Sequence, residues 1–278
     1  MRLATIRTPD GTSAARVSAD GSTLVELPAA DVGAVLARPD WPAWAAAQGG
    51  REHDAATADH APLVPRPEKI ICVGLNYRAH ILEMGRELPD FPTLFAKYAP
   101  ALIGAEDDIE LPAVSEAVDW EAELAVVVGR PVERADPAAA AAAIGGYTVL
   151  NDVTARDWQY RTKQWLQGKT FARTTPLGPY LVTPDDPAVD PAGHTITSEV
   201  NGVEKQRSTT GDLLFDPVRL VSYISAILPL SPGDVIATGT PGGVGHARSP
   251  REYLADGDTL VTRIEGIGEC RNPCRAAK

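Results

Sequence analysis

The stretch Trp120-Glu121-Ala122-Glu123-Leu124-Ala125-Val126-Val127-Val128-Gly129 places two acidic residues directly before an apolar run that ends at a glycine. A short run rich in valine predicts a buried β-strand. Glu121 and Glu123 are two positions apart, so on a strand both side chains leave the same face. Like charges on one face repel each other. Solvent, a cationic side chain or a metal ion must therefore compensate them.

Other short apolar segments lie on both sides of this strand and are separated by turn residues. Gly and Pro number 24 each, which favours many tight turns and a β-rich chain. Asp136-Pro137 followed by six alanines predicts a capped helix that ends at Gly145-Gly146. The remaining predicted strands are 69–74, 147–150, 179–183, 195–200, 234–238 and 259–264, and the remaining predicted helices are 153–165 and 220–228.

Composition limits the class of protein. The chain has 278 residues, of which 44% are hydrophobic and 23% charged, as in an ordinary globular protein. A net charge of −11 argues against nucleic acid and an anionic membrane as partners. No apolar run has the length of a signal peptide or a membrane span, so we expect a cytoplasmic protein. Of the three cysteines, Cys270 and Cys274 are expected in a plain C-terminal tail.

The N-terminal part differs from the rest of the chain in its residue pattern. Residues 1–27 alternate in polarity around Asp10-Gly11 and Asp20-Gly21, which predicts short hairpins. Residues 30–48 are alanine-rich and read as helical. A proline-rich connector follows at 61–67, where neither element can continue. We therefore predict a small N-terminal α/β domain over 1–66 and a core over 67–278.

Several polar residues are candidates for chemistry. Asp152 follows a predicted strand and can lie beside Glu121 and Glu123. Three carboxylates without His or Cys suit Mg²⁺ or Mn²⁺, with Ca²⁺ as a third candidate. The alternative is a solvated strand face. His80 and Glu83 are three residues apart and share a face if helical. They form either a base that activates water or a surface pair.

Two further segments have the composition of ligand-binding loops. Lys169 follows a glycine, which lets the backbone approach closely, and it can anchor an anionic substrate or be a surface lysine. Around Gly239, consecutive glycines leave backbone N–H groups able to face a carboxylate, although a simple turn explains them as well. His53, His60, His194 and His246 receive no role.

Six motifs occur in a fixed order. They are Gly-Leu-Asn-Tyr-x-x-His-x-x-Glu at 74–83, Asp-Trp-Glu-x-Glu-Leu at 119–124, Asn-Asp-Val-Thr-Ala-Arg-Asp-x-Gln at 151–159, Gly-Lys-Thr-Phe at 168–171, Val-Asn-Gly at 200–202, and Pro-Gly-Asp-x-Ile-x-Thr-Gly-Thr-Pro-x-Gly-Val-Gly at 232–245. Over about 68–267 the chain thus resembles the fumarylacetoacetate hydrolase family, and its acylpyruvate hydrolase and 2-hydroxyhepta-2,4-diene-1,7-dioate isomerase members with a single core.

The resemblance implies an α+β, β-rich roll of mixed sheets behind a small N-terminal domain, and a homodimer. It implies that Glu121, Glu123 and Asp152 bind Mg²⁺ or Mn²⁺. It also implies that His80 and Glu83 form a dyad on a lid and that Lys169 binds the substrate. The residues that would line the site are Arg156, Gln159, Gly239 and Thr240. Arg156 is equally a candidate for a structural ion pair with Glu121 or Glu123.

The expected activity is metal-dependent hydrolysis of a C–C bond in an acylpyruvate-like β-diketo acid, with water activated by His80 and Glu83. The alternative is decarboxylation or keto–enol tautomerisation of a 2-oxo (di)acid such as oxaloacetate or a hydroxymuconate-type dioate. A second alternative is a non-catalytic protein that binds organic acids. Many relatives have Phe-Asp after the lysine motif, whereas this chain has Phe171-Ala172-Arg173, which puts the substrate rather than the metal in doubt.

Overall fold

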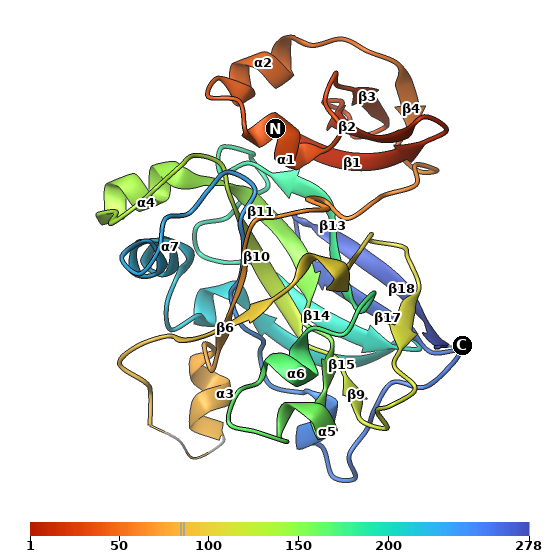
Figure 1. Cartoon of the computed structure of the whole chain (residues 1–278), viewed down its shortest axis with the longest axis vertical. Coiled ribbons are helices and arrows are strands. Elements are labelled where there is room, and N and C mark those ends of the chain that lie inside the picture. Colours follow the sequence, from red (N-terminus) through yellow and green to blue (C-terminus); the bar gives the residue numbers. More distant parts are fainter. Residues whose placement is uncertain (84, 86, 278) are drawn as a thin grey trace.

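The frame of the molecule is a long mixed sheet (Figure 1). The computed structural model describes residues 1–83, 85 and 87–277, without the side chain of Glu83. Within this part an 11-stranded sheet, a 5-stranded sheet and a two-stranded ribbon are present. In spatial order the long sheet contains β4 (Glu52–Asp54), β3 (Thr23–Glu26), β2 (Gly11–Val17), β1 (Arg2–Thr8), β13 (Thr175–Val182), β11 (Ile144–Asn151), β10 (Ala122–Val128), β16 (Val235–Ala237), β5 (Ile70–Gly74) and β6 (Thr93–Lys97), with β7 (Leu102–Ile103) pairing β13.

The other strands and the helices complete the roll. The 5-stranded sheet contains β15 (Val203–Thr209), β14 (Thr195–Val200), β17 (Thr259–Ile264), β18 (Gly268–Ala276) and β8 (Ile109–Leu111), and the ribbon contains β12 (Thr154–Ala155) and β9 (Val118–Asp119). The helices are α1 (Val32–Leu36), α2 (Trp41–Ala47), α3 (Arg78–Glu83), α4 (Pro137–Ala143), α5 (Arg156–Gln159), α6 (Leu166–Lys169) and α7 (Pro217–Ser225), with 3₁₀ turns η1 (Ala99–Ala101), η2 (Thr210–Asp212) and η3 (Gly245–Ala247).

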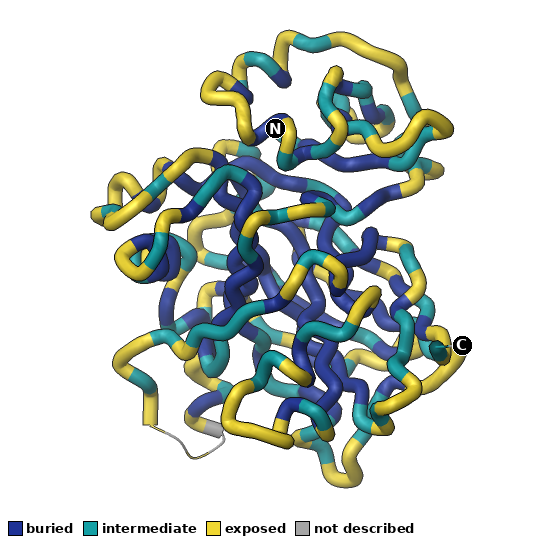
Figure 2. The backbone as a smooth tube through the Cα atoms, viewed as in Figure 1, coloured by how far each residue is buried: buried dark blue, intermediate teal, exposed yellow. Residues whose placement is uncertain are grey.

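Strand β10 lies at the centre and is buried along its whole length, as Figure 2 shows for the middle of the molecule. It pairs antiparallel with β11 on one side and with β16 on the other. Val126 and Val128 pack with residues of α4 and α7, whereas Ala125 and Val127 pack in a cluster that includes Trp41 of α2. Each valine removed from water contributes roughly 1.5–3 kcal/mol. Burial on both faces explains why the sequence is continuously apolar here.

The N-terminus of α4 follows the sequence signal, and its C-terminus does not. Asp136 caps α4 by accepting from the N–H of Ala139 over 2.8 Å. Gly145 and Gly146 were predicted to end this helix, but they belong to β11. A Cβ on Gly145 would lie 2.8 Å from the Cα of Gly129. These glycines therefore allow close approach of two backbones instead of terminating the helix.

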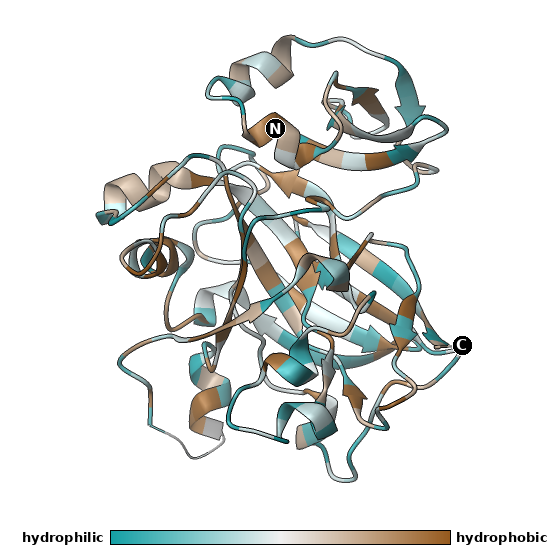
Figure 3. Ribbon diagram, viewed as in Figure 1, coloured by the Kyte–Doolittle hydropathy of each residue, from teal (hydrophilic) through white to brown (hydrophobic). Residues whose placement is uncertain are grey.

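The N-terminal segment is joined to the rest through the sheet. Strand β1 pairs antiparallel with β13, with Arg2 opposite Val182. The hairpins predicted at Asp10-Gly11 and Asp20-Gly21 are present as β1–β2 and β2–β3. At the far edge, β4 has the sequence Glu-His-Asp and is hydrophilic in Figure 3. A charged edge strand discourages further strand pairing. The boundary near residue 66 stays a prediction.

Two other predictions are wrong in detail. The segment 153–165 is not one helix, because it contains β12 and only the short helix α5. Cys270 and Cys274 do not lie in a plain tail. Both are buried in β18, a strand of the 5-stranded sheet. Strand β18 pairs with β17 on one side and with β8 on the other, so it lies inside this sheet rather than in a tail.

The predicted fold class is confirmed, since the chain is α+β, β-rich and built on mixed sheets. Parallel pairs such as β16–β5 occur beside antiparallel pairs such as β10–β11. Among the helices that the structure describes, none has the length and apolarity needed to cross a lipid bilayer.

Candidate active site

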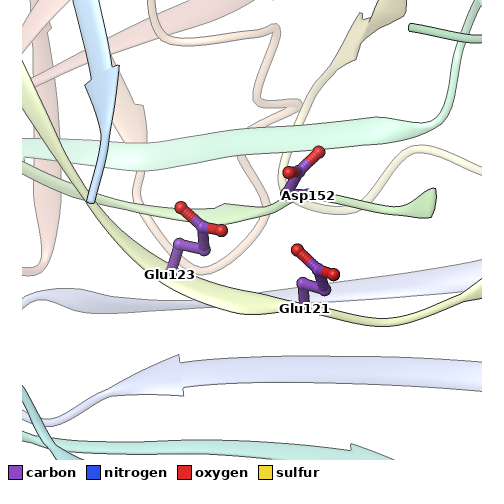
Figure 4. Close-up of side chains that lie close together, drawn as sticks. All are labelled: Glu121, Glu123 and Asp152. Atoms are coloured by element: carbon purple, nitrogen blue, oxygen red, sulfur yellow. The ribbon is translucent and has the colours of Figure 1, made fainter. Parts of the chain in front are cut away.

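Three acidic side chains meet where β10 begins and β11 ends. Glu121 directly precedes β10, Glu123 is its second residue, and Asp152 directly follows β11. The antiparallel register puts Ala122 opposite Asn151, so the start of one strand lies beside the end of the other. The N–H of Asp152 donates to the carbonyl oxygen of Glu121 over 2.8 Å. Figure 4 shows the side chains of Glu121 and Glu123 rising from one strand toward Asp152.

The three carboxylates fit a hard divalent cation. One oxygen from each residue lies within 4.8 Å of the others, and all three side chains are buried. Oxygen ligands of this kind are those that Mg²⁺, Mn²⁺ and Ca²⁺ prefer. Buried carboxylates without cationic partners are costly, so their proximity demands compensation.

Two buried lysines supply part of that compensation. Lys169 of α6 donates from Nζ to Glu121 Oε2 over 2.6 Å and to Asp152 Oδ2 over 2.8 Å. Lys97, the last residue of β6, donates to Asp152 Oδ1 over 2.5 Å. Burial alone would lower the pKa of Lys169, but Asp152 and Glu121 outweigh it and raise this pKa. Lys169 is therefore a permanently charged group and a hydrogen-bond donor.

Glu123 is the carboxylate whose charge is not balanced. Burial, together with the neighbouring charges of Asp152 and Glu121, raises the pKa of the Glu123 carboxyl well above its usual range. Among the described residues Glu123 forms no ion pair, and its Oε2 accepts only the backbone N–H of Gly239 over 2.7 Å. A divalent ion beside this carboxylate would favour its ionised form.

Arg156 links the triad to a fourth carboxylate. Its Nη2 lies 2.7 Å from Glu121 Oε1, and its Nε donates over 2.7 Å to Oδ2 of Asp119 in β9. Nη1 donates to Gln159 Oε1 over 2.9 Å. Burial opposes the charged form, yet Glu121 and Asp119 raise the pKa of Arg156. Of the two interpretations of Arg156, the ion pair with Glu121 is present, and the side chain also lines the cavity.

A cavity of about 240 Å³ opens above these charges. Its floor includes Glu121, Glu123 and Lys169, and Arg156, Gln159 and Thr240 also line it. Its apolar wall is formed by Phe95 of β6 and by Trp165, whose rings meet edge to face at 5.4 Å. Trp165 lies so close to Gly74 that a Cβ there would be 2.4 Å from Cζ3. The volume suits a small organic acid.

His80 of α3 lines the same cavity. Glu83 ends α3, but its side chain lies outside the described residues, so the contact between His80 and Glu83 stays a prediction. The backbone N–H of Gly239 was expected to face a ligand, and in the structure it binds Glu123 instead. Thr240 accepts from Gln206 Nε2 over 2.8 Å and lines the cavity.

Three residues around the triad were not predicted from the sequence. Lys97 is the last residue of strand β6. The only signal in the sequence was a lysine directly after the apolar residues of that strand, which indicates a cation buried beside an acid. Asp119 is the first residue of the motif at 119–124 and had no predicted role. Its carboxylate accepts hydrogen bonds from Arg156 and from the backbone N–H groups of Gly245 and His246. Gln206 had no signal at all, since it comes from the other sheet.

At Ala172-Arg173, where many relatives have an aspartate, the side chain of Arg173 lies away from Lys97 and Lys169. Arg173 donates to Glu110 over 2.6 Å, and its side chain is 62% exposed. The charges that act on Lys169 are those of Asp152, Glu121 and Arg156. The extra cation is therefore part of the surface near β8 rather than of the buried charge cluster.

Fold and site together define a mixed-sheet protein with a buried acidic centre under a small cavity. The family model for the C-terminal domain of fumarylacetoacetate (FAA) hydrolase matches residues 69–275. This chain belongs to that family.

Similar proteins carry several activity names. The mitochondrial oxaloacetate tautomerase FAHD2A of Bos taurus is 45% identical over 207 residues, which cover 74% of this chain and 66% of that protein. The structure of 5-carboxymethyl-2-hydroxymuconate delta-isomerase from Mycobacterium smegmatis is 39% identical, with a TM-score of 0.83 over 100% of both chains. Fumarylacetoacetate hydrolase from Exiguobacterium antarcticum is 31% identical, with a TM-score of 0.87 over 100% of both chains.

Proposed function

We propose that this protein is a divalent-metal-dependent tautomerase that interconverts the enol and keto forms of a 2-oxo dicarboxylic acid such as oxaloacetate. The observation that carries the proposal is the buried triad, of which Glu121 and Glu123 line a small cavity together with Lys169. The names of the relatives at 45% and 39% identity favour tautomerisation or isomerisation over hydrolysis as the reaction.

The triad would hold the metal, and the buried lysines and Arg156 keep the carboxylates of the triad in place. A bound divalent ion supplies Lewis-acid stabilisation of negative charge that develops on the 2-oxo oxygen. Lys97 and Lys169 fix both oxygens of Asp152, and Arg156 fixes one oxygen of Glu121. Ligands held in this way do not need to reorganise during the reaction.

Lys169 orients the acid end of the substrate. Its ammonium group has three N–H donors, of which two are used by Glu121 and Asp152. The third is available to a substrate oxygen in the cavity that Lys169 lines. Asp152 and Glu121 raise the pKa of Lys169, which favours its charged, hydrogen-bond-donating form.

His80 is the proposed proton carrier. An imidazole can accept and donate a proton near neutral pH, and this one lines the cavity from the α3 side. In the reaction the enol hydroxyl gives up its proton and C3 gains one. The C2–C3 double bond becomes a C2–oxygen double bond. No carbon–carbon σ bond is cleaved, and no oxidant or reductant is needed.

The test follows the ultraviolet absorbance of enol-oxaloacetate with Mg²⁺, with Mn²⁺ and with chelator. We expect metal-dependent loss of the enol, faster than without protein, and no matching release of CO₂. In His80→Ala the rate should fall by about 10²–10⁴-fold. His53→Ala, which removes an imidazole from β4, is the control and should keep full activity.

The same measurements, run also with acylpyruvates as substrates, separate the competing functions. Hydrolysis of an acylpyruvate is the second candidate, and the 31% identity to a fumarylacetoacetate hydrolase supports it. Cleavage of acylpyruvates with no effect on the enol would replace our proposal by the hydrolase. Conversion of oxaloacetate to pyruvate and CO₂, without faster conversion of the enol to the keto form, would mean a decarboxylase. Tight binding of 2-oxo acids without any product would mean a binding protein. The homodimer and the cytoplasmic location stay predictions.

A further inference from the structure

The wall of the cavity beside the Gly-rich loop carries a residue without an assigned role, His246. It lies in η3, directly after the loop, and it lines the cavity with Tyr160, Val244 and Ala247. The metal triad and Lys169 account for the acid end of a substrate. They leave open what the other end of a substrate would touch, and His246 is one of the polar side chains that line the cavity.

The backbone of η3 is fixed by the buried charge network. The N–H groups of Gly245 and His246 donate to Oδ1 and Oδ2 of Asp119, over 2.6 and 3.0 Å. Asp119 is fully buried and also accepts from Arg156, which itself contacts Glu121. Gly245 has no room for a side chain, because a Cβ would lie 2.0 Å from the carbonyl oxygen of Glu252. His246 is thus held at a defined position relative to the triad.

The imidazole ring is held between two tyrosines. Its centroid lies 5.4 Å from that of Tyr160 and 6.2 Å from that of Tyr253, with interplanar angles of 35° and 39°. Nδ1 lies 2.8 Å from the hydroxyl of Tyr253. That hydroxyl has no other partner in the described part of the chain, so we assign it as the donor. A neutral imidazole then carries its single N–H on Nε2, which has no described partner.

The charges around this ring favour an anion. Burial, then the cations Arg251 and Arg156, lower the pKa of His246, so the ring is neutral at neutral pH. Arg156 is already neutralised by Asp119 and Glu121. Arg251, in contrast, forms no ion pair with any described residue. One N–H donor therefore lies at this wall, and Arg251 is close enough to act on the ring without lining the cavity itself.

We propose that His246, supported by Tyr253 and Arg251, binds a second carboxylate at the far end of the substrate and so makes the site selective for 2-oxo dicarboxylates over 2-oxo monocarboxylates. This inference rests on the proposed function, since the triad must hold the 2-oxo-carboxylate end. His246 acts here as a specificity residue, and the reaction itself does not require it.

The test measures binding rather than turnover, by isothermal titration calorimetry of the Mn²⁺-loaded protein. The probes are 2-oxoglutarate, 2-oxopentanoate and oxalate. The first two have the same chain length and differ only in the terminal carboxylate, whereas oxalate has no far end. We expect 2-oxoglutarate to bind at least about 10-fold tighter than 2-oxopentanoate, as a hydrogen bond to a charged group would give.

The variants locate the preference. His246→Leu should bring the two affinities within about 2-fold of each other by weakening 2-oxoglutarate, with oxalate unchanged. His246→Gln keeps an N–H donor and should retain part of the preference. His53→Leu is the matched control and should behave as the wild type. Arg251→Gln changes an exposed side chain that forms no ion pair with the described residues, so it tests the charge even if His246→Leu fails to fold.

The outcomes distinguish the two proposals. If the wild type binds none of the three acids, the proposed function is wrong. If it binds oxalate but does not prefer 2-oxoglutarate, only the present inference is overturned. A preference that survives both His246→Leu and Arg251→Gln also overturns it, because another group then holds the second carboxylate.

Discussion

Lys97 donates from Nζ to Oδ1 of Asp152 over 2.5 Å, and both side chains are fully buried. The two residues come from distant strands of the long sheet, β6 at its edge and the end of β11 near its centre. Lys169 takes the other oxygen of the same carboxylate. Burial would raise the pKa of Asp152, but the two lysines outweigh it and lower this pKa. Asp152 is therefore ionised and fixed before any ligand enters.

Replacing Lys97 by methionine leaves a buried carboxylate with one cation fewer. Breaking a buried pair in this way typically costs about 3–5 kcal/mol. We expect Lys97→Met to lower the free energy of unfolding by that order, measured by urea denaturation with chelator present. Added Mg²⁺ should recover part of the loss, because it binds the folded state. Lys163→Met, at an exposed lysine, is the control. Equal stability of the two variants would contradict the role of Lys97.

Removing one carboxylate of the triad should remove the cation. In Glu121→Gln the amide keeps the size of the side chain and loses the charge that faces the cavity. We expect the affinity for Mn²⁺, measured by electron paramagnetic resonance titration, to fall at least about 100-fold. Such a loss exceeds the one typical of residues that only hydrogen-bond to a metal ligand. Glu116→Gln, at an exposed glutamate before β9, should bind Mn²⁺ as the wild type does. Unchanged affinity in Glu121→Gln would place the metal elsewhere.

Gly239 positions the third carboxylate through its backbone. It adopts a φ of +103°, and a Cβ would lie 2.9 Å from the carbonyl oxygen of Val73. Gly239→Ala should therefore displace the N–H that binds Glu123 and weaken Mn²⁺ binding by about 10–100-fold. Gly257 is a matched control, since its φ of +88° carries the same backbone strain with nothing within 4 Å. Gly257→Ala should lose stability, by about 1–3 kcal/mol, and keep its metal affinity. Equal metal affinity in both variants would show that the Gly239 N–H does not position Glu123.

The acidic pattern of the sequence predicted a site that the structure brings together. The spacing of Glu121 and Glu123 follows from the period of a strand, and Asp152 ends the strand that pairs with it. Such local rules hold because neighbours in sequence stay neighbours in the sheet. The partner of Asp152 was not predictable in this way, since Lys97 is 55 positions away and reaches it only through the curvature of the roll.

Local signals failed where tertiary contacts override them. Gly145-Gly146 has the composition of a helix end, but close packing of Gly145 on Gly129 places both glycines in β11. Gln206 comes from the 5-stranded sheet and binds the N–H of Ala122 beside the triad over 2.9 Å. Nothing in the sequence around Gln206 indicates which of the other strands it will face. His246 had no predicted role because it lies outside the matched motif positions, and its contact with Tyr160, which lies 86 positions earlier, gives no local signal.

The acidic loop after β13 holds the N-terminus in a pH-dependent manner. Asp186 lies 3.5 Å from the amino group of Met1 and 3.4 Å from Nε of Arg2, and it accepts the N–H of Ala188 over 3.1 Å. Partial burial opposes ionisation, but these contacts outweigh it and lower the pKa of Asp186. A carboxyl with a lowered pKa stabilises the folded state above its unfolded pKa of about 3.9, and this contribution disappears as the pH falls through the folded value.

Asp186→Asn should therefore reduce the free energy of unfolding by about 0.5–1 kcal/mol at pH 7, the size of a partly exposed ion pair. The difference from the wild type should stay constant from pH 7 to about pH 5 and shrink below about pH 4, as the wild-type carboxyl takes up its proton. Urea denaturation across this range measures it. Asp10→Asn, at an exposed aspartate in the β1–β2 turn, is the control. A difference that persists unchanged below pH 3 would show that the amide alters packing rather than charge.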